Sequence, residues 1–343
     1  MPSTKTDRMR FVRLFASLLL IASSFWSCNK DLNVNAVWTD VTVVYGLLDQ
    51  TRDTNYIKIT RAFLGEGNAL QFAKVPDSSM YPDKLEVRLD EYDGQDLRAS
   101  YPLDTVTIHN KQAGDSVFYY PDQLMYYTLA RLNQNYLYKL LIRNRATGKE
   151  VTAQTTMVHD FEVISPIMDA SFPPGKNFEV KWKTERNGNG SRFQLVIRFC
   201  YLEALKSNKD SLYMQSIDWL VFNNVSPANV AASETFDLFL PSDLFYVVVG
   251  TKVDTNANVD RRIPHHCEFI YTAAAPELST YMDVTAPSLG LIQEKPAFTN
   301  IVNGIGLFSA RHAESVDTLG ISILTIEALK VNPHTSDLKF VSP

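Results

Sequence analysis

The densest group of metal-ligating residue types in the sequence is His265-His266-Cys267. Imidazole nitrogens and thiolates are the ligands that zinc takes in proteins, usually four to a structural site. Because successive residues of a strand point to opposite faces, we expect His265 and Cys267 to share one face and His266 to lie on the other. No second cluster completes four ligands. We therefore expect no metal site here and no cofactor elsewhere in the chain.

A second group has oxygen-bearing side chains at every second position, at Asp254, Asn256, Asn258 and Asp260. Calcium-binding loops have this spacing, but they also need a glycine at a sharp turn and a glutamate that closes the coordination shell. Val259 and His265 stand at those two positions. We interpret the stretch as a solvated polar loop.

No catalytic signature accompanies these groups. The sequence lacks a Gly-x-Ser-x-Gly nucleophile elbow, a His-Glu-x-x-His zinc helix, a phosphate-binding glycine loop and a Cys-x-x-Cys pair. Its carboxylates are scattered, as at Asp90, Glu91 and Asp93, whereas a glycosidase needs two at a set distance in space. We therefore expect no catalytic residues. A carbohydrate-active enzyme with an unrecognised carboxylate pair stays open as an alternative.

The amino terminus has the pattern of an export signal. Four basic residues within the first 13 precede an apolar run from Leu14 to Trp26. That run is shorter than the roughly 20 residues that span a membrane, so residues 1–27 are typical of a signal peptide. The junction Ser27-Cys28 predicts lipidation: the Cys28 thiol would carry two acyl chains, which suffice for stable anchoring. The alternative is a plain secretory signal with an incidental cysteine.

Residues 28–38 are expected to form a polar tether. Its start, Asn29-Lys30-Asp31, resembles the short signal of lysine and acidic residues that directs Bacteroidota lipoproteins to the outer face of the outer membrane. The sequence therefore favours an outer-membrane lipoprotein on the cell surface. Attachment to the periplasmic face is the alternative.

Composition limits the class of protein. Removal of the signal, which holds four basic residues and one acidic residue, changes the formal net charge from −5 to −8. An acidic chain without a basic run argues against nucleic acid as a partner. Hydrophobic content of 45% and aromatic content of 11% are sufficient for packed cores. The remaining 316 residues suggest two domains.

Apolar and polar residues alternate along most of the mature chain, which predicts strands with one buried face. The clearest alternating sets are Leu85, Val87 and Leu89, then Phe178, Val180 and Trp182, then Phe193, Leu195, Ile197 and Phe199. Turn signals at Asp93-Gly94, Thr147-Gly148 and Asn187–Gly190 separate the strands. We expect a mainly β protein of two antiparallel β-sandwich domains, with minor helices over 241–249, 275–282 and 323–331.

The boundary between the two domains is expected near residues 158–174, where a strand ends and Pro166, Pro173, Pro174 and Gly175 cluster. This gives a first sandwich over 39–160 and a second over 161–343. Leu132 stands six residues before Tyr138, at the start of a predicted strand. This spacing resembles the tyrosine corner of immunoglobulin and fibronectin type III domains, where a tyrosine hydroxyl bonds an upstream loop backbone. Cys200 and Cys267 lie in strand-like runs, and either a disulfide or two buried free thiols is open.

The segment after Pro296 departs from the alternating pattern. Gly304 and Gly306 stand on either side of Ile305, and closely spaced glycines before a strand predict a bulge or a close approach of two backbones. One interpretation is a loop that leads into the last strand. The other is a ligand-facing loop that presents Asn300, Asn303, Gly304 and Gly306.

The stretch Phe298-Thr-Asn-Ile-Val-Asn-Gly-Ile-Gly-Leu-Phe308 resembles the closing motif of a Bacteroidota lipoprotein family, domain of unknown function 4249. Val44-Tyr45-Gly46-Leu47-Leu48 and Tyr56-Ile-Lys-Ile59 are similar to its opening strands. The resemblance covers most of the mature chain, although bulky Phe25 and Trp26 before Cys28 depart from the usual lipidation signal. It implies an envelope lipoprotein, often associated with TonB-dependent transporters, with no established catalytic residues.

These observations together favour a non-catalytic binding or accessory module, held at the membrane by its lipid, for a transport or surface assembly. An adhesin or structural surface protein is the first alternative, and the carbohydrate-active enzyme is the second.

Overall fold

The computed structural model describes residues 39–64, 80–109, 123–286 and 298–343. The predicted signal peptide, the predicted lipidation site Cys28 and the predicted tether lie outside these residues. The described residues are mainly β, with 56% in strands and 12% in helices, as the alternating pattern predicts. No helix within the described ranges has both the length and the apolar character needed to span a membrane.

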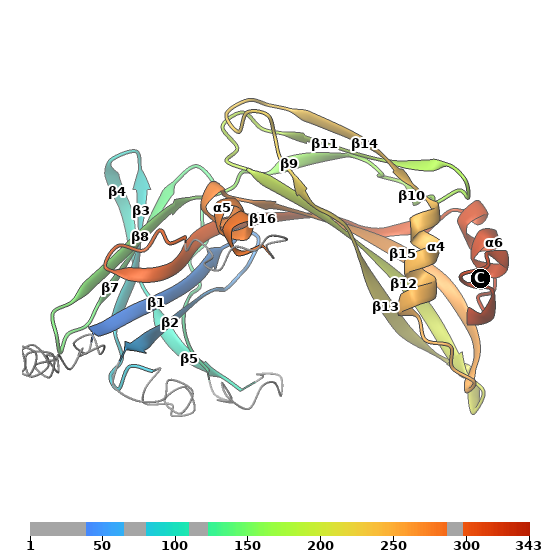
Figure 1. Ribbon diagram of the computed structural model, residues 1–343, viewed down its shortest axis with the longest axis horizontal. Coiled ribbons are helices and arrows are strands. Elements are labelled where there is room, and N and C mark those ends of the chain that lie inside the picture. Colours follow the sequence, from blue (N-terminus) through green and yellow to red (C-terminus); the bar gives the residue numbers. More distant parts are fainter. Residues whose placement is uncertain (1–38, 65–79, 110–122, 287–297) are drawn as a thin grey trace, which may run out of the picture. The chain divides into compact units, whose positions relative to one another are not determined.

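The described strands form three sheets (Figure 1). The largest has the order β13-β12-β15-β16-β1-β2-β6-β5, with β10 paired to β16, and the smaller two are β14-β11-β9 and β4-β3-β7-β8. The strands are β1 (Thr39–Leu48), β2 (Asn55–Leu64), β3 (Glu86–Asp93), β4 (Asp96–Pro102), β5 (Asp104–Ile108), β6 (Gln123–Thr128), β7 (Leu137–Arg143), β8 (Glu150–Thr156), β9 (Phe161–Ser165), β10 (Asp169–Ala170), β11 (Asn177–Thr184), β12 (Arg192–Leu205), β13 (Asn208–Val225), β14 (Thr235–Pro241), β15 (Val259–Ala274) and β16 (Gly304–Ile321).

Strand β16 connects regions far apart in the sequence. Its first half pairs in parallel with β1, from Thr42 opposite Gly304 to Leu48 opposite Ala310. Its second half pairs antiparallel with β15, beginning with Ala274 opposite Arg311. The ranges 39–160 and 161–343 therefore share one sheet, and a strand near the carboxyl terminus lies beside the first described strand.

Aromatic side chains fill the space between β14-β11-β9 and the large sheet. The Trp182 ring of β11 stacks on Phe236 of β14, with ring centroids 4.6 Å apart. The same ring contacts Phe193 and Tyr271 of the large sheet, each at 5.7 Å between centroids. All four side chains are buried, so the inward positions of the alternating strands form the core.

The predicted local elements are confirmed where the structure describes them. The helices are α4 (Asp243–Lys252), α5 (Pro276–Thr285) and α6 (Ile323–Val331), followed by the short 3-10 turn η2 (Ser336–Leu338). Gly94 and Gly148 take positive φ in the hairpin turns, as the turn signals predict. In the Asn187–Gly190 loop the two asparagines take the positive φ angles, because asparagine also tolerates the left-handed region.

The hydrogen bond expected of a tyrosine corner is present at Tyr138. Its hydroxyl accepts a hydrogen bond from the backbone N–H of Asn133 at 2.7 Å and donates one to the Glu91 carboxylate at 2.6 Å. Tyr138 is fully buried. Burial, followed by the hydrogen bond to Glu91, raises the pKa of Tyr138, so the hydroxyl stays protonated as the donor to this carboxylate.

Replacement of Tyr138 by Phe is expected to lower the free energy of unfolding by about 1–3 kcal/mol, because the buried Glu91 and the Asn133 N–H both lose a partner. Urea denaturation measures this. Tyr101→Phe is the matched control, since its hydroxyl lies 3.5 Å from the same carboxylate and makes a weaker bond. Equal losses in the two variants would contradict the role of Tyr138.

Both described cysteines are free thiols and both are buried. Cys267 lies opposite Phe199 in the core, whereas Cys200 lies opposite His266 on the other face of the sheet. Their side chains point apart, so a disulfide between them would need the backbone to move. Burial raises the pKa of both thiols, most strongly that of Cys267.

Candidate functional site

A cleft of about 640 Å³ lies over the solvent-facing side of β16, β1, β2 and β6, next to α5. Strand alternation explains its lining: Val44 and Leu48 of β1 point into the core, while Tyr45 and Leu47 between them face the cleft. The residues that line it are Tyr45, Gly46, Leu47, Asp49, Arg52, Thr54, Asn55, Tyr56, Lys58, Met125, Leu278, Tyr281, Leu307 and Arg311.

Three tyrosines give the cleft aromatic surface. Tyr45 and Tyr56 expose 44% and 43% of their surface, which is unusual among the large aromatic side chains of this chain. The Tyr45 ring meets Tyr281 of α5 edge to face, with centroids 6.4 Å apart, and Tyr56 packs beside Tyr127 at 6.2 Å. A hydrogen bond with Tyr281, followed by burial, raises the pKa of Tyr45, so this phenol stays neutral. Such rings offer stacking surfaces with polar tips.

Three cationic side chains, Arg52, Lys58 and Arg311, line the same cleft with one carboxylate, Asp49. The Asp49 side chain is buried, and its Oδ2 lies 3.3 Å from Nε of Arg311 and 3.8 Å from Nε of Arg52. Its Oδ1 accepts hydrogen bonds from the backbone and hydroxyl of Thr51. One fixed carboxylate therefore lies within ion-pair distance of two guanidinium groups at the cleft wall.

The hairpin loop between β1 and β2 positions Arg52. The Asp49 N–H donates to the side-chain oxygen of Asn55 at 2.7 Å, and the Asn55 amide donates back to the Asp49 carbonyl at 3.2 Å. The Arg52 N–H also donates to that carbonyl, closing a turn. These local bonds hold the loop in one conformation, with the long Arg52 side chain reaching solvent.

Cationic side chains outnumber carboxylates among the described residues that line the cleft, although the whole chain has a formal net charge of −5. Guanidinium groups bind carboxylate, sulfate or phosphate through charge-assisted hydrogen bonds. Together with the tyrosine rings, they can hold an anionic ligand that also has a flat apolar face.

The residues predicted as a ligand-facing loop have other contacts. The Asn300 amide donates to the Phe308 carbonyl at 2.6 Å and accepts from the Phe308 N–H at 3.0 Å. Asn303 has a φ of 61° and donates to the Glu150 carbonyl. Both side chains bind backbone of the protein itself. Leu307 and Arg311, which were not identified from the sequence, lie further along the chain in β16 and line the cleft.

Gly304 and Gly306 meet the prediction of a close backbone approach. A Cβ atom at Gly306 would lie 2.0 Å from the Val44 carbonyl oxygen of β1, and φ there is +118°. A Cβ atom at Gly304 would lie 2.8 Å from the Thr42 carbonyl oxygen. The glycines therefore allow β16 to lie against β1.

The histidine pair is arranged differently from the expectation. Cys200 lies opposite His266, but Tyr201 lies opposite Pro264, so His265 is the extra residue of a β-bulge. The bulge turns the His265 ring toward His266, with the two Nδ1 atoms 2.5 Å apart. The expectation that His265 shares a face with Cys267 is therefore wrong. His266 lies on the face opposite Cys267, as expected.

Arginine and lysine side chains of the protein contact backbone carbonyls and one carboxylate of the Asp254–Asp260 stretch. Arg262 donates to the Asp254 carbonyl at 3.0 Å, and the Lys339 ammonium donates to the carbonyls of Asn256 and Val259. Asp260 is paired with Lys209 at 2.8 Å. These contacts agree with the interpretation as a polar loop rather than a calcium site.

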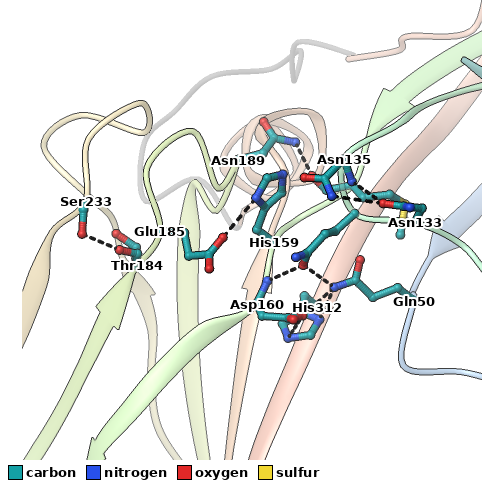
Figure 2. A network of polar contacts seen from close by, with 12 residues as sticks. Gln50, Asn133, Asn135, His159, Asp160, Thr184, Glu185, Asn189, Ser233 and His312 are labelled. Carbon is teal, nitrogen blue, oxygen red and sulfur yellow. Dashed lines mark hydrogen bonds and ion pairs between the residues drawn. The ribbon is translucent and has the colours of Figure 1, made fainter. Parts of the chain in front are cut away.

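A network of polar contacts surrounds the buried side chain of His312 of β16 (Figure 2). The Gln50 amide donates to Asp160 at 2.8 Å and to Gln134 at 3.1 Å, and its nitrogen lies 3.2 Å from Nδ1 of His312. Nε2 of His312 lies 2.8 Å from the Glu314 carboxylate. The network joins four segments that are distant in sequence, so its first role is to connect strands and loops.

Comparisons with known proteins give limited information. No family model and no curated protein matches the chain. Among solved structures, it is similar to the C-terminal globular domain of an oligosaccharyltransferase from Pyrococcus abyssi, with 9% identity and a TM-score of 0.23. That match covers 68% of this chain and 50% of the oligosaccharyltransferase chain.

Proposed function

We propose that the protein is an exported, lipid-anchored binding module whose cleft holds acidic oligosaccharides without cleaving them. The observation that carries this proposal is the combination of exposed Tyr45 and Tyr56 with Arg52, Lys58 and Arg311 in one cleft. Sugar rings stack on tyrosine faces, and their carboxylate or sulfate groups pair with guanidinium groups.

Two further features support binding over hydrolysis. Asp49 is the one carboxylate among the described residues that line the cleft; it accepts hydrogen bonds from Thr51 and lies within ion-pair distance of two arginines. A glycosidase uses two carboxyl groups on either side of the scissile bond. The signal-like residues 1–27 and Cys28 support export and anchoring, which would hold the cleft at the outer membrane.

Isothermal titration of the protein with trigalacturonate and with neutral maltotriose tests the proposal. We expect trigalacturonate to bind and maltotriose to bind at least tenfold more weakly, with affinity that falls as salt rises. Arg52→Gln should weaken trigalacturonate binding by about tenfold or more, since a charge-assisted hydrogen bond is lost. Arg52 is mostly exposed, so this variant should keep its fold.

Arg145→Gln is the matched control, because Arg145 is highly exposed and pairs with Glu86 outside the cleft. It should bind like the unchanged protein. The proposal fails if trigalacturonate does not bind, or if both arginine variants bind equally well. Release of shorter saccharides during the titration would instead favour the carbohydrate-active enzyme.

The accessory role makes a separate prediction. If the module serves a transporter, affinity purification of the chain from native outer membranes should recover a TonB-dependent transporter in constant proportion. A variant with Cys28→Ala should lose the membrane fraction and this partner together, because the anchor is gone. Recovery of the chain alone would favour the adhesin or structural alternative.

A further inference from the structure

A cluster of three ligand types lies on β12 and β15, away from the cleft. Cys200 stands opposite His266, and Glu268 follows two residues later on the same face. The Cys200 sulfur, a ring nitrogen of His266 and a Glu268 carboxylate oxygen all lie within 4.8 Å of one another. We propose that these three side chains bind a zinc ion and leave a fourth coordination position open.

The bulge at His265 orients the His266 ring. Two imidazole nitrogens 2.5 Å apart cannot both present lone pairs, so one hydrogen lies between the two Nδ1 atoms. In the zinc form this hydrogen is on His266 and is donated to His265. The lone pair of His266 Nε2 then faces Oε1 of Glu268, where a cation is needed. His265 is thus a positioning residue, fixing the tautomer of its neighbour.

The separation of the two facing atoms fits zinc. Nε2 of His266 lies 3.4 Å from Oε1 of Glu268. A charge-assisted hydrogen bond would bring these atoms to about 2.7–2.9 Å. Two ligands each about 2.1 Å from a zinc ion, at a tetrahedral angle, lie about 3.4 Å apart. The pair is therefore spaced as two ligands of one ion.

Arg198 orients the carboxylate without using the proposed ligand atom. Its guanidinium forms two hydrogen bonds with Asp218 of β13, at 2.7 and 3.1 Å, so its charge is already matched. A third N–H donates to Oε2 of Glu268 at 3.3 Å, which leaves Oε1 toward His266. Outer hydrogen bonds of this kind hold metal ligands in place.

A second cluster of similar composition, Asp160, His312 and Glu314, has a closer histidine–carboxylate pair. Because the Gln50 amide nitrogen faces Nδ1 of His312, that atom carries no hydrogen. The hydrogen is on Nε2 and is donated to Glu314 at an ordinary 2.8 Å. The remaining lone pair, on Nδ1, faces the Gln50 amide and points away from the carboxylate of Glu314.

The thiol decides which metal is favoured. A thiolate with an imidazole and a carboxylate is a zinc-type ligand set, whereas calcium and magnesium prefer oxygen ligands alone. Cys200 is buried, while His266 and Glu268 are partly exposed, so an ion can enter from the solvent side. Binding forms the zinc–sulfur bond and releases the thiol proton to water.

Metal titration of the full chain carrying Cys28→Ala tests the proposal, since Cys200 and Cys267 are then the remaining thiols. We expect one Zn²⁺ per chain, a rise in Tm that EDTA reverses, and with Co²⁺ a thiolate charge-transfer band in the near ultraviolet. Cys200→Ala should abolish the band, whereas Cys267→Ala should keep it. Absence of stoichiometric binding, or a band that follows Cys267, overturns the assignment.

A carboxylate pair gives a second, milder comparison on folded protein. Glu268→Gln should weaken Zn²⁺ binding by about tenfold or more, because a charged ligand is replaced by an amide. Glu314→Gln is its matched control on β16 and should bind Zn²⁺ like the parent. Circular dichroism confirms that both variants are folded. Weaker binding in Glu314→Gln, with Glu268→Gln unaffected, would place the metal at His312 instead.

Discussion

Replacement of Gly306 by Ala is expected to lower the free energy of unfolding by about 3 kcal/mol or more. The added Cβ would lie 2.0 Å from the Val44 carbonyl oxygen and 3.0 Å from the Val44 nitrogen, so β16 must move away from β1. The φ of +118° is also strained for any residue with a Cβ. Backbone strain and steric overlap each cost about 1–3 kcal/mol.

Gly94→Ala separates these two costs. Gly94 also has positive φ, +61°, but a Cβ there meets nothing within 4 Å. Its expected loss is therefore only the left-handed penalty, about 1–2 kcal/mol. Urea denaturation of the two variants measures the difference. Similar losses at both positions would mean that β1 and β16 do not approach as closely as described.

The second large effect is expected at Arg262, whose side chain is only 3% exposed. Its guanidinium donates to Glu203 at 2.8 Å, to the Leu338 carbonyl at 2.9 Å and to the Asp254 carbonyl at 3.0 Å. Replacement by Met keeps the apolar stem but leaves these acceptors unpaired. Breaking a buried ion pair in this way typically costs about 3–5 kcal/mol.

Arg143→Met is the control for Arg262→Met. Arg143 pairs with Glu150 at 3.7 Å, and both side chains are 54% exposed, so its loss should cost less than about 1 kcal/mol. Adding Glu203→Gln to Arg262→Met should recover part of the stability, because the unpaired carboxylate is removed. If the double variant is no more stable than Arg262→Met, the ion pair is not the source of the effect.

Both proposed sites lie on the solvent side of strands whose other side is core. Tyr45 alternates with Val44 and Gly46 on β1, and Cys200 alternates with Phe199 and Tyr201 on β12. The core faces are recognisable from apolar periodicity. The positions between the apolar residues must then face outward. Which residues of other strands lie beside them cannot be inferred from the periodicity.

Local patterns in the sequence were sufficient for much of the fold. Alternation, turn residues and caps depend on neighbours in the chain, so the strands, the three helices and the turns at Gly94 and Gly148 were predictable. The same holds for the hydroxyl bond of Tyr138 and the close approach at Gly306, because each residue type has few alternative roles at such positions.

Only the tertiary structure decided which elements meet. The parallel pairing of β1 with β16 joins opposite ends of the described chain, and no local pattern encodes it. The cleft draws on β1, β2, β6, α5 and β16 together, so Arg311 had no visible partner in the sequence. One extra residue at His265 removes this side chain from the face expected for it, because a bulge interrupts the alternation of side-chain direction along a strand. The sequence thus identified the residues able to act as ligands, and the long-range contacts determined which of them lie together.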